Sequence, residues 1–571
     1  MKFRQSEKVP KLRTRAFLLA LVLIMAGARL VRSHSRPAVA LTGHVSSEAE
    51  GPMEGVLVSA ALVGGTVSVT VVSDREGVYT FPASELPAGR YRLGIRAVGY
   101  EVGDPGELQI TAKPTQLDLK LHGTRDLASQ LTSAEWLLSV PGTEQQKGAL
   151  FRCAACHQLT PVVKSRFTAT EWSPILTRMM TWQGPSTISE PVAAPVPLRS
   201  DPPNPALADY LSSINLGKSA AWPYKLRSFP RPKGRATKVL IREYILPRKG
   251  SLPHDVAVDR QGWVWYNDFH RGYLGRLNPA TGEAKEWHVP VLKPSFPECL
   301  LALELDREGN AWLPRFYQGC SITKFDRATE KFVTWTAPAR YNGNRAQCAH
   351  IAVGAPEGTV WFSDSINFKM FKLDPRSGRV DAYDLFPGYS NDTFVNIYNY
   401  GTTGRSAGHR TYGIAVDSKG NGYFCDIAGG NIGRVDAQSG KVTLYAIPTP
   451  NSGPRRDYVD SQDRLWFGEY YAGKLGMFDT TTKQFKEWSP PTPWNGLYPV
   501  VVDRNGEAWS GGMSTDYVYR LDPKTGEWTE YLLPTWAGEI RHIGVDNFTT
   551  PVTVWIPEVH AGKIARIQAL D

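Results

Sequence analysis

The chain has 571 residues, which is too long for one ordinary domain, so several domains are expected. Its 42% hydrophobic and 21% charged residues are typical of a folded protein and exclude a largely disordered chain. The formal net charge of +10 is modest for this length, and six of the basic residues precede residue 16, so no nucleic-acid binding is expected.

The N-terminus has the pattern of an export signal. Six Lys and Arg residues precede the apolar run at 16–28, and Ala-Gly-Ala at 26–28 and Ala-Val-Ala at 38–40 both offer cleavage sites. The 13 apolar residues are short for a membrane-spanning helix, which needs about 20, although an uncleaved anchor is the alternative. We expect residues 1–37 to be a signal peptide or N-terminal anchor. The rest is then periplasmic or secreted, and it meets the membrane only if this segment is uncleaved.

Residues 38–121 alternate short apolar strands with turns, at 73–77 (SDREG) and at 87–89 (PAG), which predicts a small β-sandwich. The segment resembles the carboxypeptidase regulatory-like domain. The positions that carry this resemblance are Gly77, Tyr79, Phe81, Gly89, Tyr91, Gly99 and Tyr100. We see no cluster of His, Cys or carboxylate residues there, so we expect a structural or docking module.

Residues 153–157 read Cys-Ala-Ala-Cys-His, the C-x-x-C-H pattern of c-type haem attachment. Cys153 and Cys156 lie on one helical face and can bond the two vinyl groups, and His157 then supplies the proximal imidazole to the iron. The alternatives are a disulfide or half of a zinc site, but a zinc site needs a second Cys or His pair, and none follows before His254. We expect one covalent haem c.

The sixth iron ligand is sought among the two nearby methionines, Met179 and Met180. Thr170 can cap a helix in which Met179 shares a face with Trp172, Ile175 and Leu176. This pattern favours Met179 over Met180. Both could instead fill a hydrophobic core.

The segment 131–159 resembles the first helix and haem-binding turn of class I cytochromes c, and the segment 206–215 resembles their last helix. The resemblance implies an all-α cytochrome c domain over 122–218, followed by a linker at 219–238, and a periplasmic redox partner.

From residue 239 onward a repeat is readable through its aromatic markers. They are Trp265, Trp312, Trp361, Tyr423, Trp466, Trp509 and Trp555. Their spacing of 43 to 62 residues is close to the period of a four-stranded propeller blade, so seven markers predict seven blades over 239–571. The chain enters on VLIREYILP (239–247) with no blade before it and leaves after three strands of the last blade. The entering strand should therefore complete that blade and remove the open edges.

The largest spacing marks an insertion at about 387–411, which we expect to be a lid, a docking surface or a mobile excursion. Four cysteines lie in the repeat region, namely Cys299, Cys320, Cys348 and Cys425. They allow two disulfides in three pairings. The pair Cys299–Cys348 is favoured because both occupy equivalent places in consecutive repeats.

Units such as LWFGEYYAGKLGMFD (465–479) and VWIPEVHAGKIARI (554–567) resemble the virginiamycin B lyase family. That resemblance implies magnesium-assisted elimination in the last blade, in which Glu539 and Glu558 match the metal carboxylates and His542 matches the general base. Two departures from the family's residue pattern weaken the transfer of these roles to this chain. An extra residue separates Glu539 from His542, which reverses side-chain direction on a strand, and Tyr498 stands where a substrate-contacting histidine is expected.

The inner-strand position of the repeat is otherwise polar. Its occupants are His254, Leu301, His350, Tyr412, Arg455, Tyr498 and Arg541. A funnel lined in this way would bind a small polar or anionic ligand with or without catalysis.

These patterns predict a multidomain, mainly β protein: a small β-sandwich, a small all-α cytochrome c domain and a seven-bladed β-propeller. We expect an exported c-type haem protein that transfers electrons and is coupled to a ligand- or substrate-binding propeller, as part of a periplasmic oxidoreductase. The alternatives are a lyase of the virginiamycin B type and a non-catalytic binding scaffold.

Overall fold

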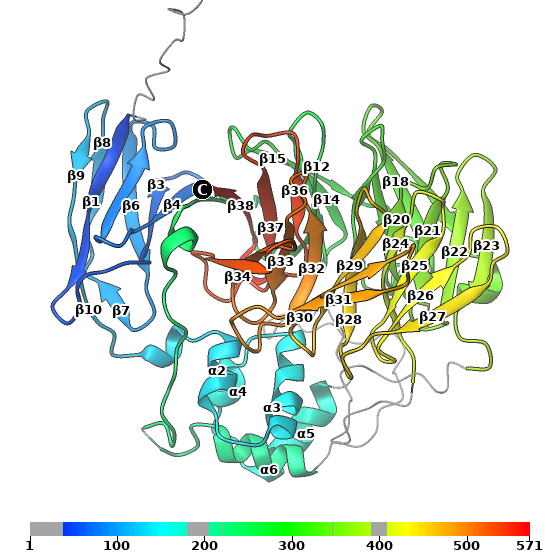
Figure 1. The fold of residues 1–571 in the computed structure, drawn as a ribbon, viewed down its shortest axis with the longest axis horizontal. Coiled ribbons are helices and arrows are strands. Elements are labelled where there is room, and N and C mark those ends of the chain that lie inside the picture. The colour runs from blue at the N-terminus through cyan, green and yellow to red at the C-terminus, as the bar shows by residue number, and fades with distance from the viewer. Residues whose placement is uncertain (1–37, 180–204, 220, 345, 390–407) are drawn as a thin grey trace, which may run out of the picture.

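The computed structural model describes residues 38–179, 205–219, 221–344, 346–389 and 408–571. They form a β-sandwich, a group of short helices and a seven-bladed β-propeller (Figure 1). The predicted signal segment, Met180 and most of the predicted insertion lie outside the described residues. Within the described parts of the chain, no helix is both long enough and apolar enough to cross a bilayer.

The predicted β-sandwich is confirmed. Its strands are β1 (Val39–Ser47), β2 (Gly51–Pro52), β3 (Leu57–Leu62), β4 (Val67–Val72), β5 (Val78–Pro82), β6 (Gly89–Arg96), β7 (Tyr100–Val102), β8 (Glu107–Ile110), β9 (Thr115–Gln116) and β10 (Leu119–Gly123). One sheet is centred on β1, and the other contains β4, β3, β6 and β8 in that order. Gly77 takes φ +77° in the turn before β5, where a Cβ atom would lie 2.6 Å from the Val45 carbonyl oxygen, so this turn requires glycine.

Five short helices follow among the described residues: α2 (Ser133–Ser139), α3 (Glu144–Phe151), α4 (Thr160–Val163), α5 (Ala169–Met179) and α6 (Pro205–Ile214). Threonines start three of them. Thr132 and Thr143 form capping boxes at α2 and α3, and Thr168 pairs with Glu171 at the start of α5. The cap of α5 is therefore Thr168 rather than the predicted Thr170. The 3₁₀ helices are η1 (Leu127–Ser129), η2 (Arg152–Ala155), η3 (Gly234–Thr237), η4 (Ala339–Tyr341) and η6 (Val559–Ala561).

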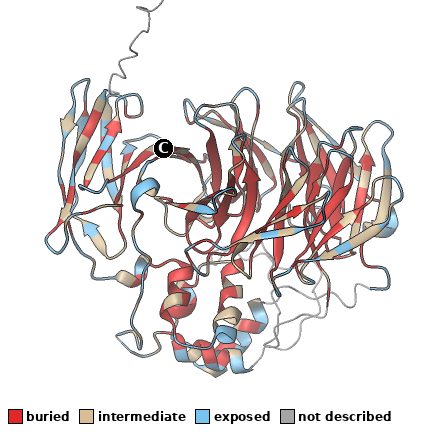
Figure 2. Cartoon of the chain, viewed as in Figure 1, coloured by how far each residue is buried: buried red, intermediate tan, exposed pale blue. Residues whose placement is uncertain are grey.

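The helical group is not a distinct domain, in contrast to the cytochrome c domain predicted over 122–218. Its buried residues, such as Trp136, Phe151 and Leu159, belong to one apolar cluster with Tyr470 and Met513 of the propeller. The helices lie against one face of the propeller, and burial is concentrated where the two meet and inside the blades (Figures 1 and 2). The helices thus share their hydrophobic core with the propeller.

The seven predicted blades are confirmed as seven sheets of four propeller strands. From the inner to the outer strand, the first six are β12 (Pro253–Val258), β13 (Val264–Asp268), β14 (Tyr273–Leu277), β15 (Ala284–His288); β16 (Glu304–Leu305), β17 (Ala311–Pro314), β18 (Ser321–Asp326), β19 (Lys331–Thr336); β20 (Cys348–Val353), β21 (Val360–Asp364), β22 (Lys369–Asp374), β23 (Arg379–Asp384); β24 (Thr411–Val416), β25 (Gly422–Asp426), β26 (Asn431–Val435), β27 (Val442–Ala446); β28 (Pro454–Val459), β29 (Arg464–Glu469), β30 (Lys474–Asp479), β31 (Phe485–Trp488); and β32 (Leu497–Val502), β33 (Ala508–Gly512), β34 (Tyr517–Asp522), β35 (Glu527–Leu532).

The seventh blade closes the ring as predicted. It contains β36 (Gly544–Asp546), β37 (Thr553–Glu558), β38 (Lys563–Ala569) and the entering strand β11 (Val239–Ile245). β11 pairs with β38 in antiparallel register from Val239↔Ala569 to Ile245↔Lys563. The first and last propeller strands are therefore joined by hydrogen bonds, which leaves no open edge between them.

A repeated hydrogen bond explains the aromatic marker. In four blades the marker indole N–H donates to an aspartate of the preceding turn over 2.8–3.0 Å. The pairs are Trp265 with Asp259, Trp312 with Asp306, Trp466 with Asp460 and Trp509 with Asp503. Because an acceptor stabilises a buried indole N–H, the turn aspartate and the marker tryptophan form one hydrogen-bonded unit in these four blades.

The observed disulfide joins Cys320 to Cys348 across the second and third blades, with the Cα atoms 4.8 Å apart. The predicted Cys299–Cys348 pair is wrong. Cys320 and Cys348 share one apolar cluster, whereas Cys299 lies in a different cluster with Phe269. Equivalent places in two repeats therefore did not mean contact.

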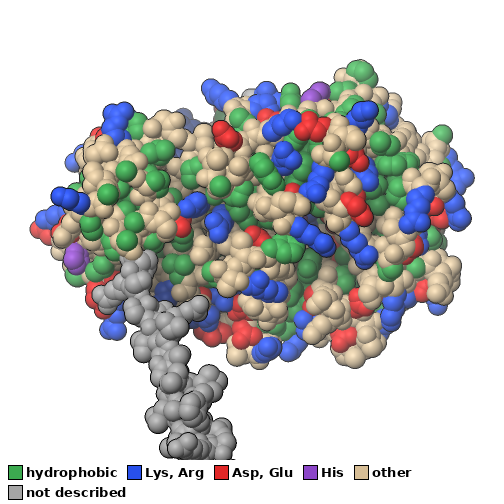
Figure 3. Space-filling model, turned by 90° about the horizontal axis from the view of Figure 1, so that it is seen from above, with side chains coloured by type: hydrophobic (Ala, Val, Ile, Leu, Met, Phe, Trp, Pro, Cys, Tyr) green, Lys and Arg blue, Asp and Glu red, His purple; other side chains and the backbone are tan. Residues whose placement is uncertain are grey.

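The sandwich and the propeller share a sheet, which the sequence did not predict. The outer edge of β11 pairs with β4, with Ile241 opposite Thr70 and Tyr244 opposite Val67. The seventh blade thus continues through β4, β3, β6 and β8 as one eight-stranded sheet. On the molecular face shown in Figure 3, acidic and basic side chains are interspersed over these two parts.

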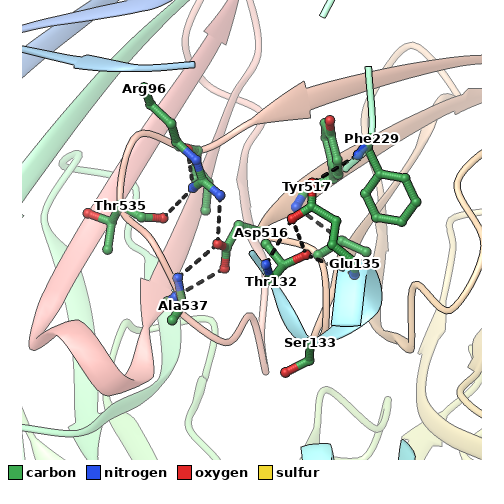
Figure 4. Close-up of polar contacts among 12 residues, drawn as sticks. Arg96, Thr132, Ser133, Glu135, Phe229, Asp516, Tyr517, Thr535 and Ala537 are labelled. Carbon is green, nitrogen blue, oxygen red and sulfur yellow. Dashed lines mark hydrogen bonds and ion pairs between the residues drawn. The ribbon is translucent and has the colours of Figure 1, made fainter. Parts of the chain in front are cut away.

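Buried charges fix the three parts to one another (Figure 4). Arg96 of β6 donates to the carbonyl oxygens of Leu533 and Thr535 at 2.7 and 2.6 Å, and it pairs with Asp516 at 3.0 Å. Both side chains of this pair are at most 3% exposed. On the helical side, Glu135 of α2 accepts a hydrogen bond from the Phe229 N–H of the linker at 2.9 Å.

Replacing Arg96 should destabilise the whole molecule. Arg96→Met leaves the Asp516 carboxylate buried without its cation, which we expect to lower the free energy of unfolding by about 3–5 kcal/mol. The measurement is chemical denaturation. Arg92→Met is the matched control, because Arg92 pairs with Glu107 at the surface and should shift stability by less than about 1 kcal/mol. Equal losses in the two variants would contradict this assignment.

Candidate functional site

The C-x-x-C-H motif forms a tight turn directly after α3. Cys153 lies in η2 and Cys156 follows it. The structure bonds neither thiol in a disulfide. Burial raises the pKa of the Cys153 thiol to about 12. The Nδ1 atom of His157 lies 2.8 Å from the Gln158 carbonyl oxygen, which fixes Nδ1–H as the donor and leaves Nε2 for coordination.

The turn faces the inner rim of the propeller. Phe151 stacks on Tyr470 at a ring-centroid distance of 5.1 Å and meets the edge of Trp494 at 5.8 Å. Burial raises the pKa of Cys156, while Arg541 lowers it and Glu539 raises it further. Both charged groups belong to the last blade, and their effect on this pKa indicates that Cys156 lies close to that blade.

The surroundings of the turn fit a covalently attached haem. The two thiols are adjacent, and an imidazole has one nitrogen held by a backbone carbonyl. Leu150, Leu159, Trp172 and Leu176 are buried nearby in the same apolar cluster. Trp172 also keeps a buried indole N–H without a hydrogen-bond partner among the described residues. A flat apolar group with polar edges matches such a lining.

The predicted face of α5 is confirmed in part. Trp172 and Leu176 are buried and Ile175 is half-buried. Met179 is the last residue of α5 and is half-buried as well. Its role as sixth iron ligand stays a prediction.

The predicted polar rim is present and tightly packed. The hydroxyl groups of Tyr412 and Tyr498 lie 2.6 Å apart, and the Arg455 guanidinium lies 4.1 Å from the Tyr498 ring centroid and 4.5 Å from that of Tyr470. Burial alone would raise the pKa of Tyr412, but Arg455 and the Tyr498 hydroxyl outweigh it and lower that pKa. Either of the two hydroxyl groups can be the donor in this pair.

A second polar layer lies deeper in the central channel. Asp255 accepts two hydrogen bonds of 2.8 Å from Arg456 and one of 2.7 Å from His254 Nδ1. The channel holds a cavity of about 80 Å³. Its polar lining includes Asp255, Glu304, His350, Arg456, Asp457 and His542.

The structure gives the three residues of the predicted magnesium site separate partners. Glu539 pairs with Arg541 at 2.9 Å and with His560 at 3.1 Å. Burial would raise the pKa of Glu539, but His560 and Arg541 lower it to about 2. His542 instead lies 3.7 Å from Asp255 and accepts a hydrogen bond from the Val256 N–H.

Glu558 has other neighbours. Burial and Glu243 raise its pKa well above the ordinary value, while Lys563 lowers it. Among the residues that the structure describes, no group of three His, Cys, Asp or Glu side chains is placed to hold a metal ion. This donor set does not fit magnesium. The extra residue before His542 explains the separation, because Arg541 takes the position beside Glu539.

Two family models match the chain: the carboxypeptidase regulatory-like domain over residues 40–122 and the virginiamycin B lyase family over residues 395–570. The propeller is virginiamycin B lyase-like. The helical group lies outside both matches. None of the curated proteins compared with the chain matches it.

Solved structures are similar in fold. Virginiamycin B lyase from Staphylococcus aureus is 21% identical with a TM-score of 0.48, covering 58% of this chain and 99% of its own. A streptogramin B lyase is 21% identical with a TM-score of 0.49, covering 59% and 99%. A B. thetaiotaomicron chain described as the extracellular domain of a one component system is 16% identical with a TM-score of 0.41, covering 55% and 40%. At these identities the likeness concerns the fold alone.

The channel predicts a pH dependence of stability. Burial raises the pKa of Glu304 from 4.5 to about 8, although the Val353 N–H donates to its carboxylate at 2.7 Å. The folded state thus keeps a proton that the unfolded state releases above about pH 4.5. The stability that this group provides is complete below that pH and is lost as the pH rises towards 8.

Glu304→Gln removes this titration and keeps the acceptor. Between about pH 5 and about pH 8, the free energy of unfolding of the wild type should fall by roughly 2–4 kcal/mol more than that of Glu304→Gln. The measurement is denaturation at several pH values. Glu308→Gln at the surface is the control and should keep the wild-type slope. If the free energy of unfolding of Glu304→Gln has the same pH slope as that of the wild type, Glu304 is not the group that causes the slope.

Proposed function

We propose that this chain is an exported c-type haem protein that transfers electrons and whose propeller binds the ligand or substrate. The observation that carries the proposal is the Cys153–His157 turn, in which both thiols and the histidine are available to a haem. When bound, the haem supplies one-electron transfer. Cys153 and Cys156 would hold it by thioether bonds, His157 would bind the iron, and Met179 is the candidate sixth ligand.

The position of the turn supports a coupling between haem and propeller. Phe151, two residues before Cys153, stacks on Tyr470 of the propeller, next to Arg455. A small polar or anionic ligand in the funnel would therefore lie close to the haem. Electrons would pass from this ligand directly to the haem, with no diffusing carrier between them. A periplasmic redox partner would then receive the electrons from the haem.

The compartment is part of the proposal. Covalent haem and a structural disulfide both belong to an oxidising compartment, and the Cys320–Cys348 bond lies in the propeller. The N-terminal signal predicted from the sequence agrees with export. We therefore place the protein in the periplasm.

Elimination of the lyase type has weaker support. It requires a divalent cation between Glu539 and Glu558, and Glu539 is already paired with Arg541 and His560. It also requires His542 as the base, but burial lowers the pKa of His542 to about 4, and its ring is held between Asp255 and Val256.

The proposal predicts haem on the exported protein. Expressed in a host that matures c-type cytochromes, the wild type should carry one haem by mass spectrometry and show a c-type α-band when reduced. Cys153→Ala and Cys156→Ala together should abolish covalent attachment, because both thioether bonds are lost. Cys425→Ala, a change at a buried cysteine outside the motif, should keep the haem. Bare thiols in the wild type would end the proposal.

The sixth ligand is tested by Met179→Ala in the haem-loaded protein. Loss of the methionine sulfur should leave the iron five-coordinate or ligated by another group, which changes the absorption spectrum of the oxidised form. Met180→Ala is the matched control. If only Met180→Ala changes the spectrum, the assignment moves to that residue.

A further inference from the structure

The cavity of about 80 Å³ in the central channel is lined by the inner strands of several blades. Glu304 lines it from β16, His350 from β20 and Asp457 from β28. One buried water needs only about 10–15 Å³ of such space. The cavity therefore has room for a ligand of several non-hydrogen atoms or for a group of waters.

The lining holds acceptors that lack a hydrogen-bond donor. Both carboxylate oxygens of Asp457 and the Nε2 atom of His350 are buried without a partner among the described residues. His350 is only 3% exposed, and burial and Arg456 lower its pKa well below the ordinary value, so its neutral ring has one nitrogen that accepts. The Cys425 thiol lowers the pKa of Asp457, but a thiol is a weak donor. Buried acceptors of this kind cost free energy unless a donor satisfies them.

The charges of the lining favour a cation. Among the described residues that line the cavity, Arg456 is the one permanent cation, and Asp255 neutralises it through two hydrogen bonds of 2.8 Å. The histidines add no positive charge, because burial lowers the pKa of His542 to about 4 and lowers that of His350 as well. Glu304 and Asp457 are therefore two carboxyl groups without a cation of their own.

These two carboxyl groups keep their protons at neutral pH. Burial raises the pKa of Glu304 to about 8, although the Val353 N–H lowers it, and burial also raises the pKa of Asp457 to about 8. Asp255 and Asp457 raise the pKa of Glu304 further, so the acidic groups lie close to one another. A cation in the cavity would take the place of such a proton.

We propose that the cavity between Glu304, His350 and Asp457 binds a small ammonium ion, either ammonium itself or a short primary amine in its charged form. N–H groups donate over about 2.7–3.2 Å, and a primary ammonium has three such donors for acceptors on three inner strands. A metal ion needs ligands that are closer together, and no group of three His, Cys, Asp or Glu among the described residues is placed to hold one. The site contains no residue of the Cys153–His157 turn and does not depend on the haem.

Binding conserves the charge of the cavity. The ammonium ion enters as a cation, and one carboxyl group releases its proton to the solvent. Above about pH 8 the carboxyl groups are ionised and no proton has to leave, so the affinity is highest there. Below that pH, each displaced proton weakens binding by about tenfold per pH unit.

The probe is methylammonium, titrated by calorimetry into the exported full-length protein. We expect saturable binding at about pH 8 and binding that is roughly tenfold or more weaker at about pH 6. Titrations at the lower pH in two buffers of different ionisation enthalpy should show the release of about one proton. Tetramethylammonium carries the same charge without an N–H donor and should not bind.

Two variants test the position of the site. Asp457→Asn removes one carboxylate, and Ala302→Val fills part of the cavity while it keeps every charge. Both should bind methylammonium roughly tenfold or more weakly than the wild type. Glu308→Gln, a change at an exposed carboxylate, is the control and should bind like the wild type.

Three results would overturn the proposal. They are no saturable binding to the wild type at the higher pH, equal binding of tetramethylammonium and methylammonium, or wild-type binding by both variants. If a variant does not fold, the wild type decides, because binding that releases no proton at the lower pH cannot come from these carboxyl groups.

Discussion

The arrangement of this molecule depends on the hydrogen bonding of strand β11 along both edges. One edge closes the propeller against β38, and the other receives β4 of the sandwich. An isolated closing strand would expose a row of unpaired backbone groups. Here β4 of the sandwich pairs with that row. The strand that closes the propeller is therefore also the strand that attaches the sandwich.

The position of the helices depends on the attachment of the sandwich to the propeller through β11. Once the sandwich is attached, Arg96 reaches the buried Asp516 in the sixth blade, and α2 lies beside this pair with its own buried Glu135 (Figure 4). The helical group buries Phe151 against Tyr470 of the rim. The Cys153–His157 turn is held over the funnel for this reason.

Sequence reasoning predicted what repeats or has a local pattern. The blades were countable because the turn aspartate and the marker tryptophan form one hydrogen-bonded unit, as Asp460 and Trp466 do. The sandwich was predicted from its turns, and the rim positions from the inner-strand register. The β4–β11 pairing, the shared core of the helices and the Cys320–Cys348 bond join segments far apart in the chain, and no periodic pattern encodes such contacts.

Sequence reasoning likewise predicted some residues of the candidate site and missed others. Most of the polar rim was predicted correctly, because its residues recur at one position of the repeat, whereas the haem at the Cys153–His157 motif stays a prediction. The Asp255–Arg456 pair and Tyr470 were missed, since each is only a neighbour of a rim or strand-end position and has no spacing of its own. The separation of His542 from Glu539 follows from one extra residue in the segment that precedes β36.

The proposed function requires a haem between the helices and the propeller rim. An iron anomalous difference map from crystals of the haem-loaded protein would locate it. We expect one iron peak beside His157, on the side of the turn that faces Tyr470 and Arg541. An iron peak elsewhere in the molecule, or none in protein crystallised after maturation, would contradict it.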